Sequence, residues 1–449
     1  MGKKNTETSE PSKRKARKGV IPFVFLSHKF EDIDEQTAKR HLLYLAVASV
    51  AAKLAVVFVT TVMFKSFIDY FDIGVYLEHV QRLLQGQSPF NLEFQYPILI
   101  FVPLLIAIVP AILFQNAMAF VFTFQVLMVI CDIVTILCIY LIALRLWNER
   151  TAFTAGILYA VAFTAAYFVI TKYDAFPTCL LMLAILCTVY RQEVKGYAVS
   201  VLGLFTKVFP VLALPFFVLY NAKRTSLKQE VIAAAKVAIP IGVVLFLPLF
   251  ILMPETFRIY VPVRSDLGFY SNTLTFTIYS WVHDVFHIGI SIDTVSAIMY
   301  IAMGVGILAL LYAAYIIPGR DLALMIKLIL CATVLVVICA RVRSPQYIVW
   351  FTPLLCLLAA DDVRKIVALF VFQGLAYIEF PLMFGNFYTA LQYTEPALSS
   401  GWMITLVVFT LEYLALFVCL WFVVNPMVIF RRIRQAVAKK GCENTTPSD

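Results

Sequence analysis

The chain has 449 residues, of which 62% are hydrophobic and only 14% are charged, and its mean hydropathy is +0.88. A soluble domain could not cover its surface with so few charges, so the composition indicates a polytopic membrane protein. The net charge of +9 is concentrated in tails and short loops, which indicates membrane orientation and argues against a nucleic-acid partner. The nine cysteines lie mostly inside apolar runs and lack the spacing of a disulfide framework or a zinc site.

Apolar runs long enough to cross a hydrocarbon core recur from Leu42 to Val424, so we expect an all-α transmembrane bundle of about 11–12 membrane segments. Three regions follow from this pattern: a basic, disordered cytoplasmic tail over residues 1–41, one transmembrane unit over 42–430, and a cytoplasmic tail over 431–449. No soluble catalytic domain is appended within these boundaries. Any chemistry must therefore use the spans and short loops.

The first span is expected over residues 42–64, and the basic tail before it places the N-terminus in the cytoplasm. On the outer side, Tyr76, His79, Val80 and Leu83 then recur at helical spacing among polar residues. This pattern predicts an amphipathic helix lying along the outer membrane surface.

Residues 97–114 form a short apolar run that carries three prolines. If this run crossed the membrane, the basic connectors 145–150 and 191–195 would lie outside, against the positive-inside rule. A segment that enters and returns restores the rule, and it implies a buried or wet cavity around non-helical backbone. Residues 197–220 pose the same problem, and two half-helices meeting near Lys207 would keep both of their basic flanks inside.

With this topology both termini are cytoplasmic, and the polar motifs discussed next lie on or face the outer side. The remaining spans are expected over 118–143, 153–170, 175–190, 231–252, 291–317, 322–339, 346–360, 366–383 and 402–424.

Asp72 follows the first span and opens the surface helix, where a carboxylate is poorly explained by span packing. It could be a general base that accepts a proton from an acceptor hydroxyl. It could equally cap the helix by accepting a backbone N–H of Gly74 or Val75. No second Asp occupies the next-but-one position, so an Asp-x-Asp metal pair is not expected here.

Two further motifs carry charge near the outer face. Lys172 and Asp174 flank Tyr173 at a span end, where they could meet a phosphate and an acceptor or simply pair with each other. Lys207 lies between two apolar half-helices, and a lysine at that depth costs several kcal/mol unless an anion or water meets it. A lipid-linked phosphate is the natural anion there, with a structural ion pair as the alternative.

Arg341 and Arg343 lie on the outer side, against the positive-inside bias. Guanidinium groups bind phosphate oxygens in a bidentate way, and Ser344, Gln346 and Tyr347 could hydrogen-bond a phosphate or a sugar. Contact with lipid headgroups is the plainer alternative.

Other polar residues in unusual places are interpreted structurally. His283 and His287 have i, i+4 spacing but no convincing third ligand, so we expect a surface pair and no metal site. Lys53 and Asp132 lie inside apolar runs, where we expect them to pair with each other or with polar neighbours.

In combination these motifs resemble the GT-C integral membrane glycosyltransferases, most of all the family 87 polyprenol-phosphate-mannose-dependent mannosyltransferases. A weaker resemblance is to the catalytic subunit of GPI mannosyltransferase I. The resemblance covers about residues 71–350, and the order of the motifs is more specific than any one of them. The matching segments are Asp72 with Tyr76, Leu84-x-Gly86-x-Ser88-Pro89-Phe90, Tyr96-Pro97, Lys172-Tyr173-Asp174-Ala175, Leu204-Phe205-Thr206-Lys207-Val208-Phe209-Pro210 and Ser344-Pro345-Gln346-Tyr347-x-x-Trp350.

The resemblance implies an inverting transfer of a sugar, mannose in family 87, from a polyprenyl phosphate to a lipid or glycan hydroxyl on the outer or lumenal face. It gives Asp72 the role of catalytic base. It implies donor phosphate and sugar contacts for Lys207 and for Ser344 to Tyr347, beside the two arginines. Tyr76, Lys172 and Asp174 would support the acceptor side.

We therefore expect polyprenyl-phosphate sugar, an acceptor and membrane lipids as partners and no cofactor, and Asp72 without a second Asp leaves dependence on a divalent metal open. The plasma membrane of a prokaryote is favoured over the endoplasmic reticulum. The alternative hypothesis is a transporter or flippase of a lipid-linked or phosphorylated solute, in which the same cations would form the binding site. No internal repeat of the kind found in inverted-repeat transporters is apparent in the sequence.

Overall fold

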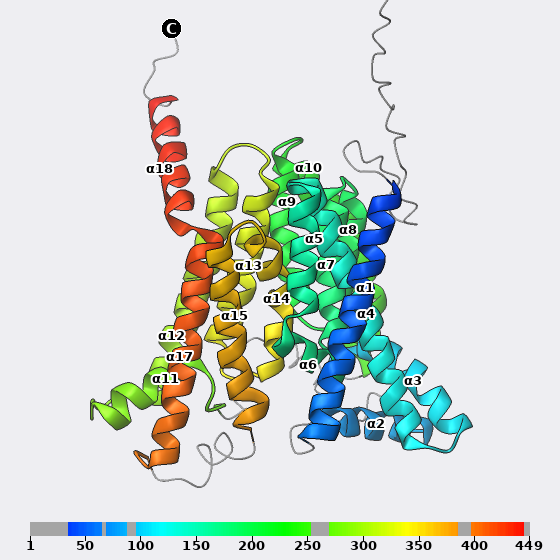
Figure 1. Ribbon diagram of the computed structural model, residues 1–449. Coiled ribbons are helices and arrows are strands. Elements are labelled where there is room, and N and C mark those ends of the chain that lie inside the picture. The colour runs from blue at the N-terminus through cyan, green and yellow to red at the C-terminus, as the bar shows by residue number, and fades with distance from the viewer. Residues whose placement is uncertain (1–34, 65–68, 88–95, 253–268, 385–396, 444–449) are drawn as a thin grey trace, which may run out of the picture.

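The computed structural model describes residues 35–64, 69–87, 96–252, 269–384 and 397–443. Over these residues the chain is a bundle of helices without a strand, as expected from the sequence (Figure 1). The helices are α1 (Glu35–Phe58), α2 (Phe71–Leu84), α3 (Phe101–Leu113), α4 (Ala117–Leu146), α5 (Glu149–Ala160), α6 (Phe163–Thr171), α7 (Ala175–Val189), α8 (Glu193–Leu204), α9 (Leu214–Ala222), α10 (Leu227–Leu252), α11 (Leu274–Tyr279), α12 (Ile292–Ile316), α13 (Leu322–Cys339), α14 (Ile348–Ala359), α15 (Val363–Tyr377), α17 (Ser400–Val424) and α18 (Pro426–Glu443). Short 3-10 or π turns are η1 (Val59–Met63), η3 (Ile98–Ile100), η4 (Phe209–Ala213), η6 (Ser280–Val285), η7 (Pro345–Tyr347) and η8 (Ile378–Leu382).

Seven of the described helices are long and apolar enough to cross a membrane, and the bent pair α5 and α6 would make an eighth. The chain is thus an integral, multi-pass membrane protein. The most buried of the seven are α13 and α4, whose apolar windows are 61% and 56% buried, while the window of α10 is only 6% buried. The first two therefore form the centre of the bundle, and α10 turns most of its apolar surface outward, toward lipid.

The sequence predicts one continuous span over residues 153–170, but in the structure this segment is broken into two helices. The chain bends by 57° between α5 and α6. At the break the amides of Val161 and Ala162 bond back to Ile157 and Tyr159, which closes α5, and the Thr164 hydroxyl bonds the carbonyl oxygen of Gln373 at 2.6 Å. Hydropathy alone could not reveal this bend because both halves are equally apolar.

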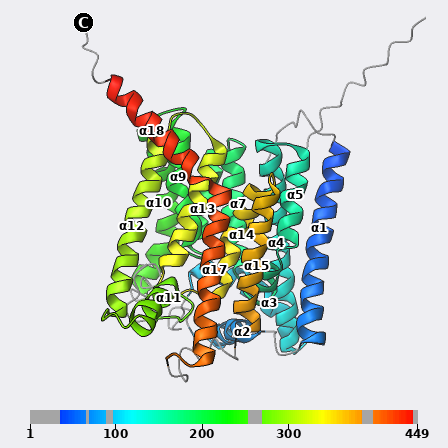
Figure 2. The ribbon, with the colours of Figure 1, turned by 60° about the vertical axis from the view of Figure 1, so that its left-hand side comes forward.

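The two ends of the bundle are distinct. The start of α1 lies at the same end as α18, which leaves the bundle and projects away from it in both views (Figures 1 and 2). Helix α2 lies across the opposite end (Figure 1). We call these the α18 end and the α2 end.

Helix α2 is the predicted amphipathic surface helix. It buries Ile73, Tyr76 and Val80, which share one face at i, i+3 and i+7, and it leaves Phe71 and Leu84 exposed. It packs on α3, which lies beside it in both views and returns to the start of α4 through a three-residue turn (Figures 1 and 2). Residues 98–113 are too short to count among the helices able to cross a membrane, which agrees with the expectation that this segment does not cross.

The second predicted re-entrant segment consists of α8, η4 and α9. The chain reverses between Leu204 and Phe209, so that η4 and α9 pack back against α8. The reversal is tight: a Cβ atom on Gly203 would lie 2.4 Å from the Cβ of Pro210, and the Ser200 hydroxyl bonds the Pro210 carbonyl at 2.9 Å. A glycine is required at this close approach. The hairpin places Lys207 at its tip, and the adjacent Phe205 carbonyl bonds the amide of Leu99 at the start of η3.

The pairing expected for the two charges in the early apolar runs is confirmed. Lys53 on α1 lies 2.7 Å from Asp132 on α4, and the Ser49 hydroxyl bonds the same carboxylate at 2.6 Å. Both charged side chains are almost fully enclosed, with exposures of 3% and 1%. This pair fastens α1 to the centre of the bundle.

Candidate active site

Two carboxylates share one lysine at the α2 end. The Nζ atom of Lys172, in the turn between α6 and α7, lies 2.7 Å from Oδ2 of Asp69 and 3.0 Å from Oδ2 of Asp72. The lysine is buried because α6 and α7 are packed in the core, while the aspartates reach it from the start of α2. Lys172 does not pair with Asp174, which was the alternative left open by the sequence.

The two aspartates differ in what else they bind. The Oδ1 atom of Asp69 accepts the backbone N–H of Phe71 at 2.9 Å, so Asp69 bonds the first turn of α2 and has both oxygens engaged. The amide of Gly74 bonds the Tyr70 carbonyl, as in an ordinary helix. Asp72 contacts Lys172 through Oδ2, and within the described part of the chain its Oδ1 has no hydrogen-bond partner. Asp69, and not Asp72, therefore accepts a backbone N–H at the start of α2.

A second ion pair lies at the tip of the α8 to α9 hairpin. The Nζ atom of Lys207 is 2.6 Å from Oδ1 of Asp174, the residue immediately before α7. The indole N–H of Trp350 donates to the same oxygen at 2.5 Å. The other oxygen of Asp174, Oδ2, is buried and has no hydrogen-bond partner among the described residues.

Aromatic rings surround the ammonium group of Lys207. The rings of Tyr173, Tyr347 and Trp350 lie 4.7, 4.8 and 4.9 Å from Nζ, all within the range of cation–π attraction. Trp350 is held between two stacked neighbours, Phe209 at 4.3 Å and Tyr347 at 4.0 Å between ring centroids. The orientation of the cage is therefore fixed by η4 and η7 together.

Tyr173 and Tyr96 connect the two ion pairs. The Tyr173 ring contacts Tyr76 of α2 at 5.8 Å and Tyr96 at 5.3 Å, and its other contact is Lys207. Burial, with the nearby carboxylates of Asp72 and Asp174, raises the pKa of the Tyr96 hydroxyl, which stays neutral. We call Asp69, Asp72, Lys172, Asp174 and Lys207 the aspartate–lysine cluster.

The structure places Arg343 elsewhere. Its guanidinium lies against Glu412 of α17 and 3.3 Å from Glu379 of η8, and it donates to the Asn272 carbonyl at 3.0 Å and the Tyr413 hydroxyl at 3.3 Å. Asn272 also donates to Glu379 at 2.6 Å. We call Arg343, Glu379 and Glu412 the arginine–glutamate cluster. Its guanidinium is engaged by protein groups on several sides, which argues for a structural role.

The remaining members of the predicted motif flank Arg343 in sequence. Arg341 lies 3.0 Å from the exposed Asp293 and stacks over the Phe269 ring at 3.9 Å. Ser344 is half-buried and immediately precedes η7, Gln346 is buried, and Tyr347 joins the cage around Lys207. The structure thus brings Tyr347 together with Lys172, Asp174, Asp72 and Lys207, and it directs Arg343 to a different set of partners.

Three carboxylates were missed in the sequence. Asp69 lies three residues before Asp72, which is a helical spacing, whereas the expected acidic pair was sought at the next-but-one position. Glu379 and Glu412 each lie alone inside a long apolar run, and that isolation is a signal that could have identified them. The segment Ser88 to Phe90, part of the family-like motif, lies outside the described residues.

His79 and His283 contact groups of their own segments. The Nδ1 atom of His79 is 2.7 Å from the Val75 carbonyl one turn earlier, and His283 pairs with the adjacent Asp284 at 2.8 Å. Within the described ranges no three His, Cys, Asp or Glu side chains come together as a metal site.

Comparisons with known proteins assign this chain to no family. No family model matches the sequence, and no curated protein matches it. Two solved structures of ArnT from Cupriavidus metallidurans are similar to this chain, each with 15% identity. The form bound to undecaprenyl phosphate has a TM-score of 0.45 over 83% of this chain and 76% of that chain, and the apo form has 0.44 over 87% and 75%. At these scores the similarity carries no conclusion about what this chain binds or does.

Proposed function

We propose that the protein is a membrane glycosyltransferase that moves a sugar from a polyprenyl-phosphate donor to a hydroxyl acceptor at the aspartate–lysine cluster. The observation that carries the proposal is the arrangement around Asp174. One of its oxygens is held by Lys207 and Trp350, and the other is buried with no partner in the described part of the chain. A buried carboxylate oxygen without a donor is costly, and a sugar hydroxyl is a donor of the right kind.

We assign the role of base to Asp72. Its Oδ1 atom is unoccupied in the described residues and its side chain is 16% exposed, whereas both oxygens of Asp69 are engaged. Lys172 holds Asp72 in place. In the reaction Asp72 takes the proton of the acceptor hydroxyl as the acceptor oxygen bonds to the anomeric carbon.

Lys207 is the better of the two lysines for the donor phosphate. Lys172 faces two carboxylates, so its charge is already more than balanced, whereas Lys207 faces one carboxylate and keeps 14% of its side chain exposed. As the bond from the anomeric carbon to the phosphate oxygen breaks, its electron pair stays on the phosphate, and the ammonium group stabilises that charge. Attack opposite to the leaving phosphate inverts the anomeric centre.

The aromatic cage suits the sugar. The rings of Tyr347 and Trp350 beside Lys207 form an apolar wall, and Asp174 and Gln346 offer hydrogen-bonding groups next to it. We propose mannose as the sugar because the order of motifs resembles family 87. In this scheme Arg341 and Ser344 contribute to donor binding at the rim, and Arg343 supports the segment that carries Tyr347.

The orientation of the chain in the membrane follows from the distribution of its basic residues. We assign the α18 end to the cytoplasm because the connections from α4 to α5, from α7 to α8 and from α14 to α15 lie there, and these segments carry Arg145, Arg191 and Arg364. The α2 end then faces the outside or the lumen. Acceptor hydroxyls would reach Asp72 from that side.

Transfer by purified protein tests the proposal. The protein would be incubated with a panel of radiolabelled polyprenyl-phosphate sugars and a lipid extract, and glycosylated product would be separated by chromatography. We expect label to move to an acceptor, with polyprenyl-phosphate mannose as the preferred donor. Movement of intact donor across proteoliposomes without any product would instead identify a flippase and overturn the assignment.

A further inference from the structure

Helix α18 begins at the boundary of the membrane. Only Asn425 separates it from α17, and this residue takes the left-handed conformation that commonly ends a helix. Helix α18 contacts α12, and Arg432 pairs at 2.7 Å with Asp321, the residue before α13. Because α12, α13 and α17 have the length and composition of spans, their ends mark the level at which hydrocarbon meets water. The start of α18 therefore lies among the lipid head groups.

One row of residues holds α18 against the bundle. Ile429, Ile433 and Ala436 are spaced at i, i+4 and i+7, so they share one face of the helix. The two isoleucines are half-buried against the central core, and Ala436 is buried in it. This packing determines which side of α18 stays open.

A second row, one residue further along, lies on the open side. Phe430, Arg434 and Val437 have the same spacing, and all three side chains are exposed, Phe430 by 66%. We call this row the α18 stripe. It places a guanidinium between two large apolar groups, a combination that fits an interface where apolar groups meet acyl chains and cations meet phosphates.

The charge of α18 has one sign. Residues 426–442 contain five basic residues and no acidic one. Arg432 is paired with Asp321, whereas Arg431 and Arg434 are exposed and have no ion pair among the residues that the structure describes. With a rise of about 1.5 Å per residue, Arg434 lies within roughly 15 Å of the end of α17 whatever the tilt of α18. An anionic surface at the span ends is the complement of these charges.

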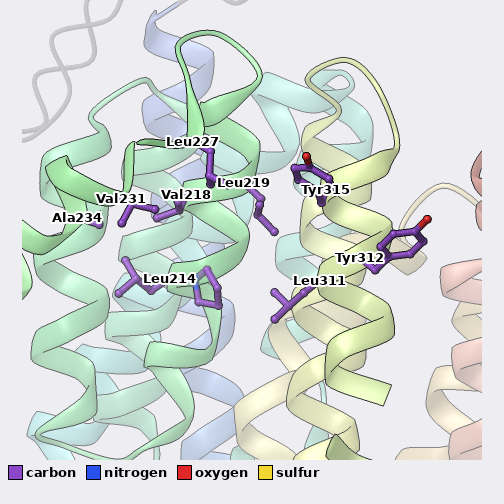
Figure 3. A pocket seen from close by; sticks show the side chains of 10 residues that line it. Leu214, Val218, Leu219, Leu227, Val231, Ala234, Leu311, Tyr312 and Tyr315 are labelled. Carbon is purple, nitrogen blue, oxygen red and sulfur yellow. The ribbon is translucent and has the colours of Figure 1, made fainter. Parts of the chain in front are cut away.

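An apolar cavity near the same end of α12 lacks this combination. It lies between α9, α10 and α12, has a volume of about 570 Å³, and is lined by side chains such as Leu214, Leu311 and Tyr312 (Figure 3). None of the lining residues that the structure describes is charged, so its wall does not distinguish one lipid head group from another. The α18 stripe, by contrast, presents apolar groups and a cation together.

We propose that the α18 stripe and the adjacent Arg431 bind anionic phospholipids of the leaflet at the α18 end, with Phe430 against the acyl chains and both arginines on the phosphates. The partner is the membrane that contains the chain, because α18 starts beside three span ends. The bound head groups fasten α18 to that leaflet and, through the Arg432–Asp321 pair, the start of α13 as well. The proposal requires neither glycosyl transfer nor an assignment of the two ends to cytoplasm and outside.

The test compares lipid retention in two variants that lose the same charge at the same end. Arg434 and Arg364 are both exposed, but Arg364 already pairs with Asp362 at 2.9 Å. Full-length wild type, Arg434→Gln and Arg364→Gln would be reconstituted in nanodiscs with equal phosphatidylglycerol and phosphatidylcholine, extracted, and examined by native mass spectrometry. Because one basic residue near an anionic surface contributes about 1 kcal/mol, Arg434→Gln should lower phosphatidylglycerol retention about fivefold, and Arg364→Gln should leave it unchanged.

A double variant enlarges the expected effect. Changing Arg431→Gln together with Arg434→Gln should lower phosphatidylglycerol retention about 25-fold and leave phosphatidylcholine retention as in wild type. Equal retention of the two lipids by wild type would overturn the proposal, and so would equal losses in Arg434→Gln and Arg364→Gln. Co-purification of an acidic protein that needs both arginines and displaces phosphatidylglycerol would assign the surface to a protein partner instead.

Discussion

The molecule contains two buried clusters of charged side chains, and they differ in whether solvent or a substrate can reach them. In the aspartate–lysine cluster Asp69, Asp72 and Lys207 keep 14%, 16% and 14% of their side chains exposed, while Lys172 and Asp174 keep 6% and 0%. In the arginine–glutamate cluster Arg343 keeps 6%, and the two glutamates keep 1% each. A cluster closed to solvent and substrate can fix the fold but cannot do chemistry, so access separates a reactive site from a structural one.

The clusters are joined by one short segment. Arg343 and Tyr347 lie four residues apart, the first bound to Glu379 and Glu412, the second stacked on Trp350 beside Lys207. Arg343 therefore anchors the backbone that brings Tyr347 into the cage. The comparison predicts that damage to the arginine–glutamate cluster changes stability first, and damage to the aspartate–lysine cluster changes activity first.

The largest effect on folding is expected from Arg343→Met. This change leaves two buried carboxylates without their cation, and breaking a buried pair in this way costs about 3–5 kcal/mol. The yield of monodisperse protein and its thermal midpoint would be measured. Adding Glu379→Gln and Glu412→Gln to the same chain should restore part of the loss.

A matched control for this change lies on the surface. Arg364 pairs with Asp362 at 2.9 Å but is 78% exposed, so Arg364→Met should leave the thermal midpoint unchanged. If Arg343→Met were as harmless as Arg364→Met, the structural assignment of Arg343 would be wrong.

The next largest effect is expected on turnover, and it distinguishes the Lys207–Asp174 pair from the Lys53–Asp132 pair. The double change Lys207→Met with Asp174→Asn removes both charges together, so no unpaired charge remains. Because the cation stabilises the leaving phosphate, we expect transfer to fall about 100-fold or more. The same double change at Lys53 and Asp132, an equally short pair closed to substrate, should alter stability but leave the rate within severalfold of wild type. Equal losses of turnover in the two variants would contradict the comparison.

A smaller effect is expected from Trp350→Phe. Phenylalanine keeps an aromatic face for stacking on Phe209 and Tyr347 but removes the indole N–H that holds Asp174. Loss of one hydrogen bond to a charged group, worth about 1.5–3 kcal/mol, should lower kcat/KM by about tenfold or somewhat more. Steady-state kinetics with the preferred donor measure it, and Trp350→Leu, which removes the stacking as well, should be slower still.

Much of the fold could be predicted from the sequence because hydrophobic run length and loop charge determine where a chain crosses a membrane. The surface helix α2 and both re-entrant segments were predicted on these grounds. The break between α5 and α6 was missed because it lies between two equally apolar stretches.

The site was predictable in its residue types but not in its pairing. Lys172, Asp174 and Lys207 were identified as unusual charges near the outer face, yet which carboxylate each lysine meets depends on how α2, α7 and the α8 to α9 hairpin pack. Arg343 shows the same limit: its partners Glu379 and Glu412 lie more than thirty residues away in sequence. Charge and position indicate that a residue needs a partner, and only the packing identifies it.

The most direct measurement compares Asp72→Asn with Asp69→Asn in single-turnover transfer from polyprenyl-phosphate mannose. Both residues contact Lys172 and have nearly equal exposure, so the pair controls for loss of charge at this position. If Asp72 is the base, Asp72→Asn should be slowed at least about 100-fold with an unchanged thermal midpoint, while Asp69→Asn stays within about tenfold of wild type. Turnover by Asp72→Asn at the wild-type rate would contradict the assignment of the base.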